Sequence, residues 1–152
     1  MTTSLRTPAV LGKPVVDPAI WVGEELQGNQ SWLYELGSEE INGLLAMARN
    51  VRPLIGDDPS RLLALDKSHF NLGVFQHTLT SIWRQLRDGM GVALIRGLPL
   101  GDMEPIEAAS VYWGIGRHLG DARSNNPEGD MLGHVTDLGK TQDDPNSRGY
   151  QT

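Results

Sequence analysis

Apolar residues recur at helical spacing in three stretches of the chain, and these stretches predict its main helices. The first lies in "GSEEINGLLAMARN", where Ser38 is expected to be the N-cap residue and two glutamates favour the positive end of the helix dipole. We expect this helix to end near Asn50 and Pro53, because proline cannot continue the helical hydrogen-bond pattern. Its apolar stripe is predicted to contain Ile41, Leu44, Leu45 and Ala48.

A second helix and a strand are predicted in the middle of the chain. The segment 73–88, "GVFQHTLTSIWRQLRD", has an apolar face at helical spacing and is followed by Gly89, a common helix stop. The run "GVALIRG" at 91–97 is short, mostly apolar and bounded by glycines, which predicts a buried strand. The buried face of the helix is predicted to contain Phe75, Leu79, Ile82, Trp83 and Leu86.

The third helix is predicted at 103–120, after which the character of the sequence changes. Asp102 is expected to cap this helix, Pro105 falls in its first turn and Gly120 stands at its end. Beyond it, glycine, asparagine, aspartate, proline and serine predominate, and 131–139 is the only candidate strand. A strand there without further strands would leave unpaired backbone groups at an edge.

The N-terminal segment 1–19 contains three prolines and is predicted to be an extended arm without a helix of its own. Trp21 and Trp32 follow and are expected to anchor this arm to the body. Residues 20–152 are expected to belong to a single domain. The pattern of helices followed by a strand, a helix and a loop-rich region indicates an α+β fold.

Composition limits the classes of function. The chain has 152 residues, 39% hydrophobic and 21% charged residues, and a formal net charge of -6, which argues against nucleic acid or an anionic membrane as the main partner. Its apolar runs are too short to span a bilayer, and the N-terminus lacks the pattern of a secretory signal. Cysteine is absent, so disulfides and thiolate chemistry are excluded. A cytoplasmic location is the simplest expectation.

Several motifs invite a catalytic interpretation, but a structural one is favoured. The spacing in "GIGRHLG" differs from a dinucleotide fingerprint and the motif falls in a helix, so its glycines are expected to allow close helix packing. Tyr112 and the tryptophans are expected in the core. His69 and His77 have no acidic residue at ligand spacing, and His118 falls in a last helical turn, where a cationic imidazole suits the dipole.

His134 and Asp137, in "HVTD", are the closest approach to a metal-ligand pair. On a regular strand, ligands on one face are two residues apart, whereas these two are three apart. The pair is therefore a poor match to the two-histidine, one-carboxylate iron site. The residue types alone complete no catalytic site.

Three ordered blocks of the sequence, "GMGVALIRGLPL", "ASVYWGIGRHLGDARSNNPEGDMLGHVTDLG" and "NSRGYQT", resemble the N-terminal half of the taurine dioxygenase-like (TauD/TfdA) family. These proteins are iron(II)- and 2-oxoglutarate-dependent oxygenases. The resemblance covers residues 21–152 and is strongest from Gly91 onward. It implies an incomplete double-stranded β-helix (jelly roll), in which "GVALIRG" is an early strand and the helix with Tyr112 and Trp113 packs against the barrel.

The resemblance also implies what the chain lacks. The family holds iron with a His-x-Asp pair and a distal histidine, and binds 2-oxoglutarate with a later arginine. These groups would follow residue 152, so no catalytic or metal-binding residue is assigned here and neither cofactor is expected on this chain alone. The positions implied to approach the substrate pocket are Asn125, Asn126, Arg148, Tyr150 and Thr152.

The sequence leaves three functional hypotheses. The first is the front part of an oxygenase that oxidises a small organic substrate, possible also as a homo-oligomer. The second is a non-catalytic module that pairs with a partner chain through an open sheet edge. The third, the least favoured, is a small metalloprotein that uses His134 and Asp137.

Overall fold

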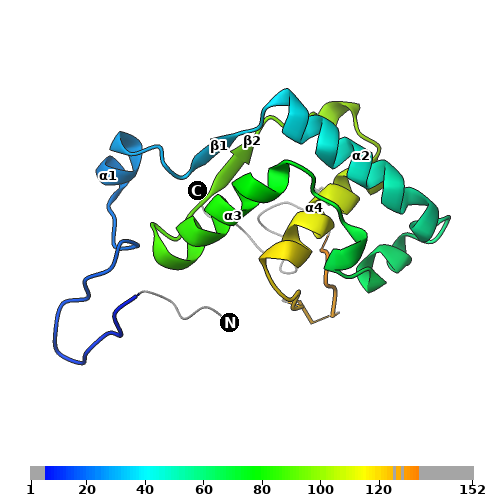
Figure 1. Ribbon diagram of the computed structural model, residues 1–152. Helices are drawn as coiled ribbons and strands as arrows, with labels where there is room; N and C mark the ends of the chain where they lie inside the picture. Colours follow the sequence, from blue (N-terminus) through cyan, green and yellow to red (C-terminus); the bar gives the residue numbers. More distant parts are fainter. Residues whose placement is uncertain (1–5, 125, 128, 134–152) are drawn as a thin grey trace, which may run out of the picture. The chain divides into compact units, whose positions relative to one another are not determined.

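The computed structural model describes residues 6–124, 126–127 and 129–133. The chain divides into two compact units, Met1–Ala122 and Arg123–Thr152, and all assigned helices and strands lie in the first. Figure 1 shows these elements in chain order. They are α1 (Gly23–Gly28), β1 (Leu33–Glu35), α2 (Ser38–Ile55), the 3-10 helices η1 (Pro59–Ala64) and η2 (Lys67–His69), α3 (Phe75–Asp88), β2 (Leu94–Arg96), η3 (Leu100–Asp102) and α4 (Pro105–Leu119).

The N-cap residue of helix α2 lies one position earlier than predicted. Gly37 occupies the N-cap position, and its N–H donates to Oε2 of Glu40 at 2.9 Å. The prediction that Ser38 is the N-cap was therefore wrong; Ser38 lies in the first turn. Glu40 satisfies a backbone donor that the helix itself cannot, and it places negative charge at the positive end of the dipole.

Helix α2 also continues past the predicted stop at Asn50 and Pro53, to Ile55. Pro53 lies in the last turn, where its missing N–H removes one hydrogen bond. Val51 and Ile55 are almost completely buried, and this burial outweighs the lost bond. Of the predicted stripe, Leu44 and Ala48 are buried and Ile41 and Leu45 are partly exposed.

The helical core consists of α2, α3 and α4 together with η1 and η2. Helix α2 contacts α4, α3 and η1, and α4 also contacts η1 and η2. Buried apolar side chains from all of these elements except η2 fill the space between them. The core side chains with essentially no exposed surface include Leu44, Met47, Val51, Ile55, Leu62, Phe70, Leu72, Phe75, Leu79, Ile82 and Val111.

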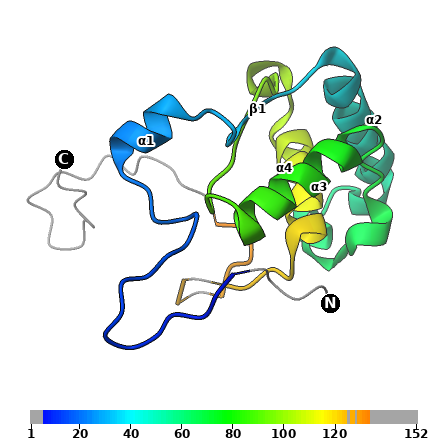
Figure 2. The same ribbon diagram turned by 60° about the vertical axis from the view of Figure 1, so that its left-hand side comes forward.

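Helix α3 matches its prediction in position, with Gly89 at its C-cap, but only part of the predicted face is buried. Phe75, Leu79 and Ile82 are buried, whereas Trp83 is partly exposed and Leu86 is exposed. The C-terminal turn of α3 extends away from α2 in both views (Figures 1 and 2). Leu86 is therefore exposed, although it continues the helical spacing of apolar residues.

A two-stranded parallel sheet joins β1 and β2, with Tyr34 opposite Ile95 in the register. The strand predicted at 91–97 is present but shorter, and the prediction that it is buried was wrong, because Leu94 and Arg96 are exposed. These two side chains share one face of the strand. No other strand covers that face among the residues described. Strand β1 was not predicted.

Helix α4 has Pro105 at its first position and Gly120 at its C-cap, as predicted. Asp102 does not cap it, which corrects the prediction, because Asp102 ends the separate turn η3. The N-cap residue is Glu104, whose N–H donates to Oε2 of Glu107 at 3.1 Å. The extended conformation of Met103 separates the two turns.

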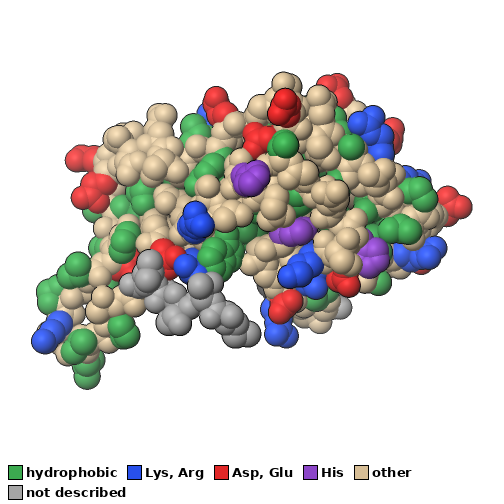
Figure 3. All heavy atoms as spheres, in the orientation of Figure 1, with side chains coloured by type: hydrophobic (Ala, Val, Ile, Leu, Met, Phe, Trp, Pro, Cys, Tyr) green, Lys and Arg blue, Asp and Glu red, His purple; other side chains and the backbone are tan. Residues whose placement is uncertain are grey.

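The N-terminal arm, described from residue 6, contains no helix, as its prolines predict. Trp21 anchors it as predicted, since its Nε1–H donates to the Met90 carbonyl at 2.9 Å. Trp32 instead donates to Leu26 in α1. Apolar side chains stand out along the arm in Figure 3. The strongly exposed ones are Val10, Leu11, Val15 and Val16, and Ile20 and Val22 directly after the arm are exposed as well.

Arg6 provides the main attachment of the arm. Its Nε–H donates to the carbonyl of Arg87 at 2.6 Å and an Nη2–H donates to that of Gly89 at 3.0 Å. It also pairs with Asp17 at 3.1 Å. A cation at these carbonyls suits the negative end of the α3 dipole.

Among the described helices, none has the length and apolar character needed to cross a membrane.

Candidate functional site

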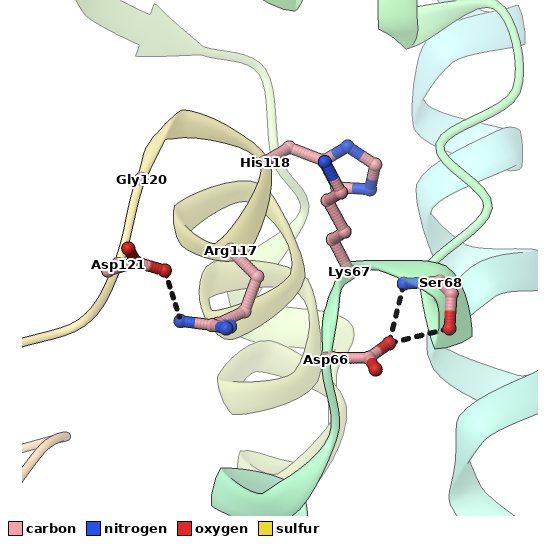
Figure 4. A pocket seen from close by; sticks show the side chains of 7 residues that line it. All are labelled: Asp66, Lys67, Ser68, Arg117, His118, Gly120 and Asp121. Carbon is pink, nitrogen blue, oxygen red and sulfur yellow. Dashed lines mark hydrogen bonds and ion pairs between the residues drawn. The ribbon is translucent and has the colours of Figure 1, made fainter. Parts of the chain in front are cut away.

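A cleft of about 390 Å³ lies between η2 and the last turn of α4. Figure 4 shows Lys67 extending from η2 toward the His118 ring, while Arg117 reaches toward Asp121. Most of its lining is polar or charged. The residues that line it are Asp66, Lys67, Ser68, Arg117, His118, Gly120 and Asp121.

Asp66 is committed to local hydrogen bonds. Its Oδ1 accepts from the backbone N–H of Ser68 at 2.8 Å, from the Ser68 hydroxyl and from Nδ1 of His69 at 3.0 Å. The bonds from Ser68, and then those from His69, lower the pKa of Asp66. Ser68 and His69 both bind the same carboxylate oxygen, so they do not form a Ser-His-Asp relay.

Arg117 is the most enclosed cation of the cleft. Its Nη1 lies 3.7 Å from Oδ1 of Asp121, whose side chain is 84% exposed. An ion pair at this distance and with this solvent exposure contributes little to stability. The guanidinium lies 5.9 Å from the centre of the Trp113 ring. Its Nε is buried without a hydrogen-bond partner in the described structure. The charge of Arg117 is therefore only partly compensated.

His118 separates the cleft from a second hollow. Its Nε2 lies 2.9 Å from the carbonyl oxygen of Phe70, and because a carbonyl can only accept, Nε2 carries a proton. This bond fixes the ring. The second hollow has a volume of about 210 Å³. Its other lining residues are Gln76, Leu79, Thr80 and Trp83.

The structure confirms some of the predictions for the four histidines and corrects others. His118 lies in the last turn of α4, as predicted. The expectation that His69 lacks an acidic neighbour was wrong, because the 3-10 turn of η2 brings it to Asp66. His77 is exposed on α3. His134, like Asp137, lies outside the described residues.

The "GIGRHLG" motif has one glycine that close packing requires. A Cβ on Gly114 would lie 2.7 Å from Cδ1 of Phe70 and 3.2 Å from Sδ of Met47, so only glycine fits, as predicted for helix packing. At Gly116 the same atom would meet nothing within 4 Å. Trp113 is buried as expected, but Tyr112 is 70% exposed, and its assignment to the core was wrong. Consecutive helical positions point in different directions, so only one of the two can face the core.

Of the positions implied to approach a substrate pocket, Asn126 is described, and it lies in the second unit. Its Nδ2–H donates to Asp130 Oδ2 at 2.9 Å, and its Oδ1 accepts from the Asp130 N–H at 2.8 Å. These bonds organise a local turn. The role of Asn126 in binding a substrate stays a prediction. The remaining four positions, Asn125, Arg148, Tyr150 and Thr152, lie outside the described residues.

Within residues 6–124, 126–127 and 129–133, no three histidine, aspartate or glutamate side chains come together as a metal site requires.

The cleft was not found from the sequence. Lys67 and Arg117 are 50 positions apart, and no periodicity links them. One local feature could have indicated part of it: "DKS" repeats the pattern of "DPS" at Asp58, and in both the aspartate accepts from the serine two positions later. This pattern predicts a turn but not a cavity.

Comparison with known proteins gives one distant relative. Over 144 residues the chain is 28% identical to FR-33289 synthase of Streptomyces rubellomurinus, a match that covers 94% of this chain and 41% of the relative. The chain thus spans less than half the length of that protein. No family model matches the chain. The chain is similar to an enzyme, and its class follows only as a proposal.

Proposed function

We propose that the chain forms the N-terminal part of an iron(II)- and 2-oxoglutarate-dependent oxygenase that oxidises a small organic substrate. The observation that carries this proposal is the similarity to a synthase along 94% of the chain. The three sequence blocks that resemble taurine dioxygenase-like proteins give the reaction class. Both the similarity and the resemblance extend beyond any single motif.

In this proposal the chain contributes scaffold and pocket rim. The helical core would support a jelly-roll barrel, with β2 as one of its early strands. Asn125, Asn126, Arg148, Tyr150 and Thr152 would line the approach to the substrate. The iron ligands and the arginine for 2-oxoglutarate would come from residues beyond position 152, in the part of the relative that the match does not cover.

The proposal is tested with a protein that carries residues 1–152 followed by the residues encoded directly downstream. We expect a His-x-Asp pair within about 30 codons, room for a few strands of ~5–6 residues with their turns. With dioxygen present, the purified protein should convert 2-oxoglutarate to succinate and carbon dioxide when ferrous ion is added, and not when zinc is added. A downstream region without His-x-Asp, or a protein that releases no succinate, would contradict the proposal.

The alternative, a binding module that pairs through a sheet edge, has less support because the relative is named as a synthase. The two hypotheses differ in a simple measurement. A module should elute from a size-exclusion column with a partner chain or as a defined oligomer and melt cooperatively at this length. An oxygenase part should melt cooperatively through its helical core as well, but should elute without a partner chain.

A further inference from the structure

The cleft and the second hollow share His118 as a common wall, and together they offer two different environments. The cleft side presents the ammonium of Lys67 and the guanidinium of Arg117. The other side presents the partly exposed ring of Trp83, with the buried Leu79 behind the lining. The residues that line both sides belong to the first unit.

The charges of the cleft favour a negative partner. Its two carboxylates neutralise its two cations only formally, because Asp66 already accepts from Ser68 and His69. Asp121 lies in solvent, 3.7 Å from Arg117. For Lys67, no ion pair or side-chain hydrogen bond is present in the described part of the chain. An anion entering the cleft would replace a weak ion pair and displace little structure.

The second hollow favours an apolar group. The guanidinium of Arg87 lies 3.9 Å from the centre of the Trp83 ring, and Leu79, another lining residue, is buried. Gln76 and Thr80 form the polar edge. Aromatic and aliphatic walls with a few polar groups at the rim are typical of small-molecule sites.

We propose that these two hollows form one binding site for an amphiphilic organic carboxylate. The carboxylate would lie in the cleft lined by Lys67 and Arg117, and an aromatic or branched apolar body would lie in the second hollow against the ring of Trp83. His118, fixed by its bond to Phe70, separates head from body. The site stands apart from the oxygenase proposal, because it requires neither iron nor 2-oxoglutarate.

Phenylbutyrate, a carboxylate joined to a phenyl ring by a short chain, tests the site on the metal-free chain. NMR signals of the His118 ring and of the Trp83 indole should both move, with the same dissociation constant. The neutral amide of the probe and butyrate, which has no ring, should each bind at least about fivefold more weakly, since one loses the charge and the other the apolar contact.

Lys67→Ala should weaken phenylbutyrate binding about fivefold or more, because it removes a direct charge contact. Arg84→Ala is the matched control: it removes the same charge from an exposed position on α3 that lines neither hollow, and it should change affinity less than about twofold. Both side chains are exposed, so both variants should keep the melting temperature of the parent chain.

Several results would overturn the proposal. Equal binding of the acid and its amide would show that the cations play no part. Equal losses of phenylbutyrate affinity in Lys67→Ala and Arg84→Ala would show that only the net charge of the chain matters. Movement of the Trp83 signals without those of His118, or no movement at millimolar probe, would show that the hollows are not one site.

Discussion

The helical core and the N-terminal arm belong to the same unit but are held by different kinds of contact. In the core, side chains such as Leu44, Ile55 and Phe75 have no exposed surface. In the arm, Leu11 and Val16 are 102% and 86% exposed, and attachment depends on hydrogen bonds from Arg6 and Trp21 to backbone carbonyls. The core is thus stabilised by the burial of apolar surface area, and the attachment of the arm by a few hydrogen bonds.

This difference determines how each region should respond to substitution. Loss of one apolar side chain removes area and leaves a cavity in the core, whereas it removes almost nothing in the arm. Loss of one hydrogen-bonding side chain should release the arm without unfolding the core. Apolar and polar substitutions should therefore have opposite patterns in the two regions.

The largest expected effect is on the core. Phe75→Ala should lower the free energy of unfolding by about 3–5 kcal/mol, since it removes a completely buried ring. Leu11→Ala, the matched truncation in the arm, should change it by less than about 0.5 kcal/mol. Urea denaturation followed by circular dichroism measures both, and similar values for the two would remove the distinction between the regions.

The next effect separates two glycines of α4. Gly114→Ala should destabilise by about 1–3 kcal/mol, because its Cβ would collide with Phe70 and Met47. Gly116→Ala meets open space in the same helix and should stabilise by about 0.5–1 kcal/mol. Thermal melts of the pair give the answer. A neutral Gly114→Ala would contradict the close packing of α4 on Phe70.

A smaller, local effect is expected at the arm. Arg6→Ala removes its bonds to the end of α3, worth about 1 kcal/mol. Cleavage of the arm by subtilisin should then be about fivefold faster, because proteolysis follows the open population. Lys13→Ala changes an exposed charge of the same arm and should leave the rate unchanged. The free energy of global unfolding should not change in Arg6→Ala. A loss of about 1 kcal/mol in that free energy would mean that the arm is part of the cooperative core.

The smallest effect concerns the aspartates that cap η1 and η2. Hydrogen bonds from Ser60 and Ser68 lower the pKa values of Asp58 and Asp66 below the ordinary value of 3.8. A carboxylate whose pKa is lowered by folding stabilises the fold above its unfolded pKa, and this contribution is lost as pH falls through the folded pKa.

Carboxyl NMR titration measures these values directly. Ser68→Ala should raise the pKa of Asp66 toward 3.8 but not fully, because the backbone N–H of residue 68 still donates to it. The pKa of Asp58 serves as the internal control and should stay unchanged. An Asp66 value at or above 3.8 in the parent chain would contradict the capping geometry.

Much of the helical core could be predicted from the sequence, because apolar period and helix-ending glycines act locally. Helices α3 and α4 begin and end close to their predicted positions for this reason. The continuation of α2 through Pro53 could not be predicted, since the burial of Ile55 that favours it depends on the neighbouring elements. Strand β1, with three residues, is too short for any period to be visible.

Contacts between distant residues were beyond the reach of sequence patterns. Arg6 meets a carbonyl 81 positions away, and nothing near either residue indicates the pair. The cleft has the same origin, because Lys67 and Arg117 line one cavity only after α4 packs on η2. Tyr112 and Trp113 show the limit within one helix, where the residue type suits the core at both positions and the direction of the side chain decides.

We propose that this chain is the N-terminal part of an oxygenase, with its iron and 2-oxoglutarate ligands in residues that follow position 152. Anaerobic binding tests it most directly, because ferrous ion and 2-oxoglutarate bound together give a visible charge-transfer absorption whatever the substrate is. We expect this absorption from the protein extended by its downstream residues and none from residues 1–152 alone. Its appearance in the 152-residue chain, or its absence from the extended protein, would contradict the claim.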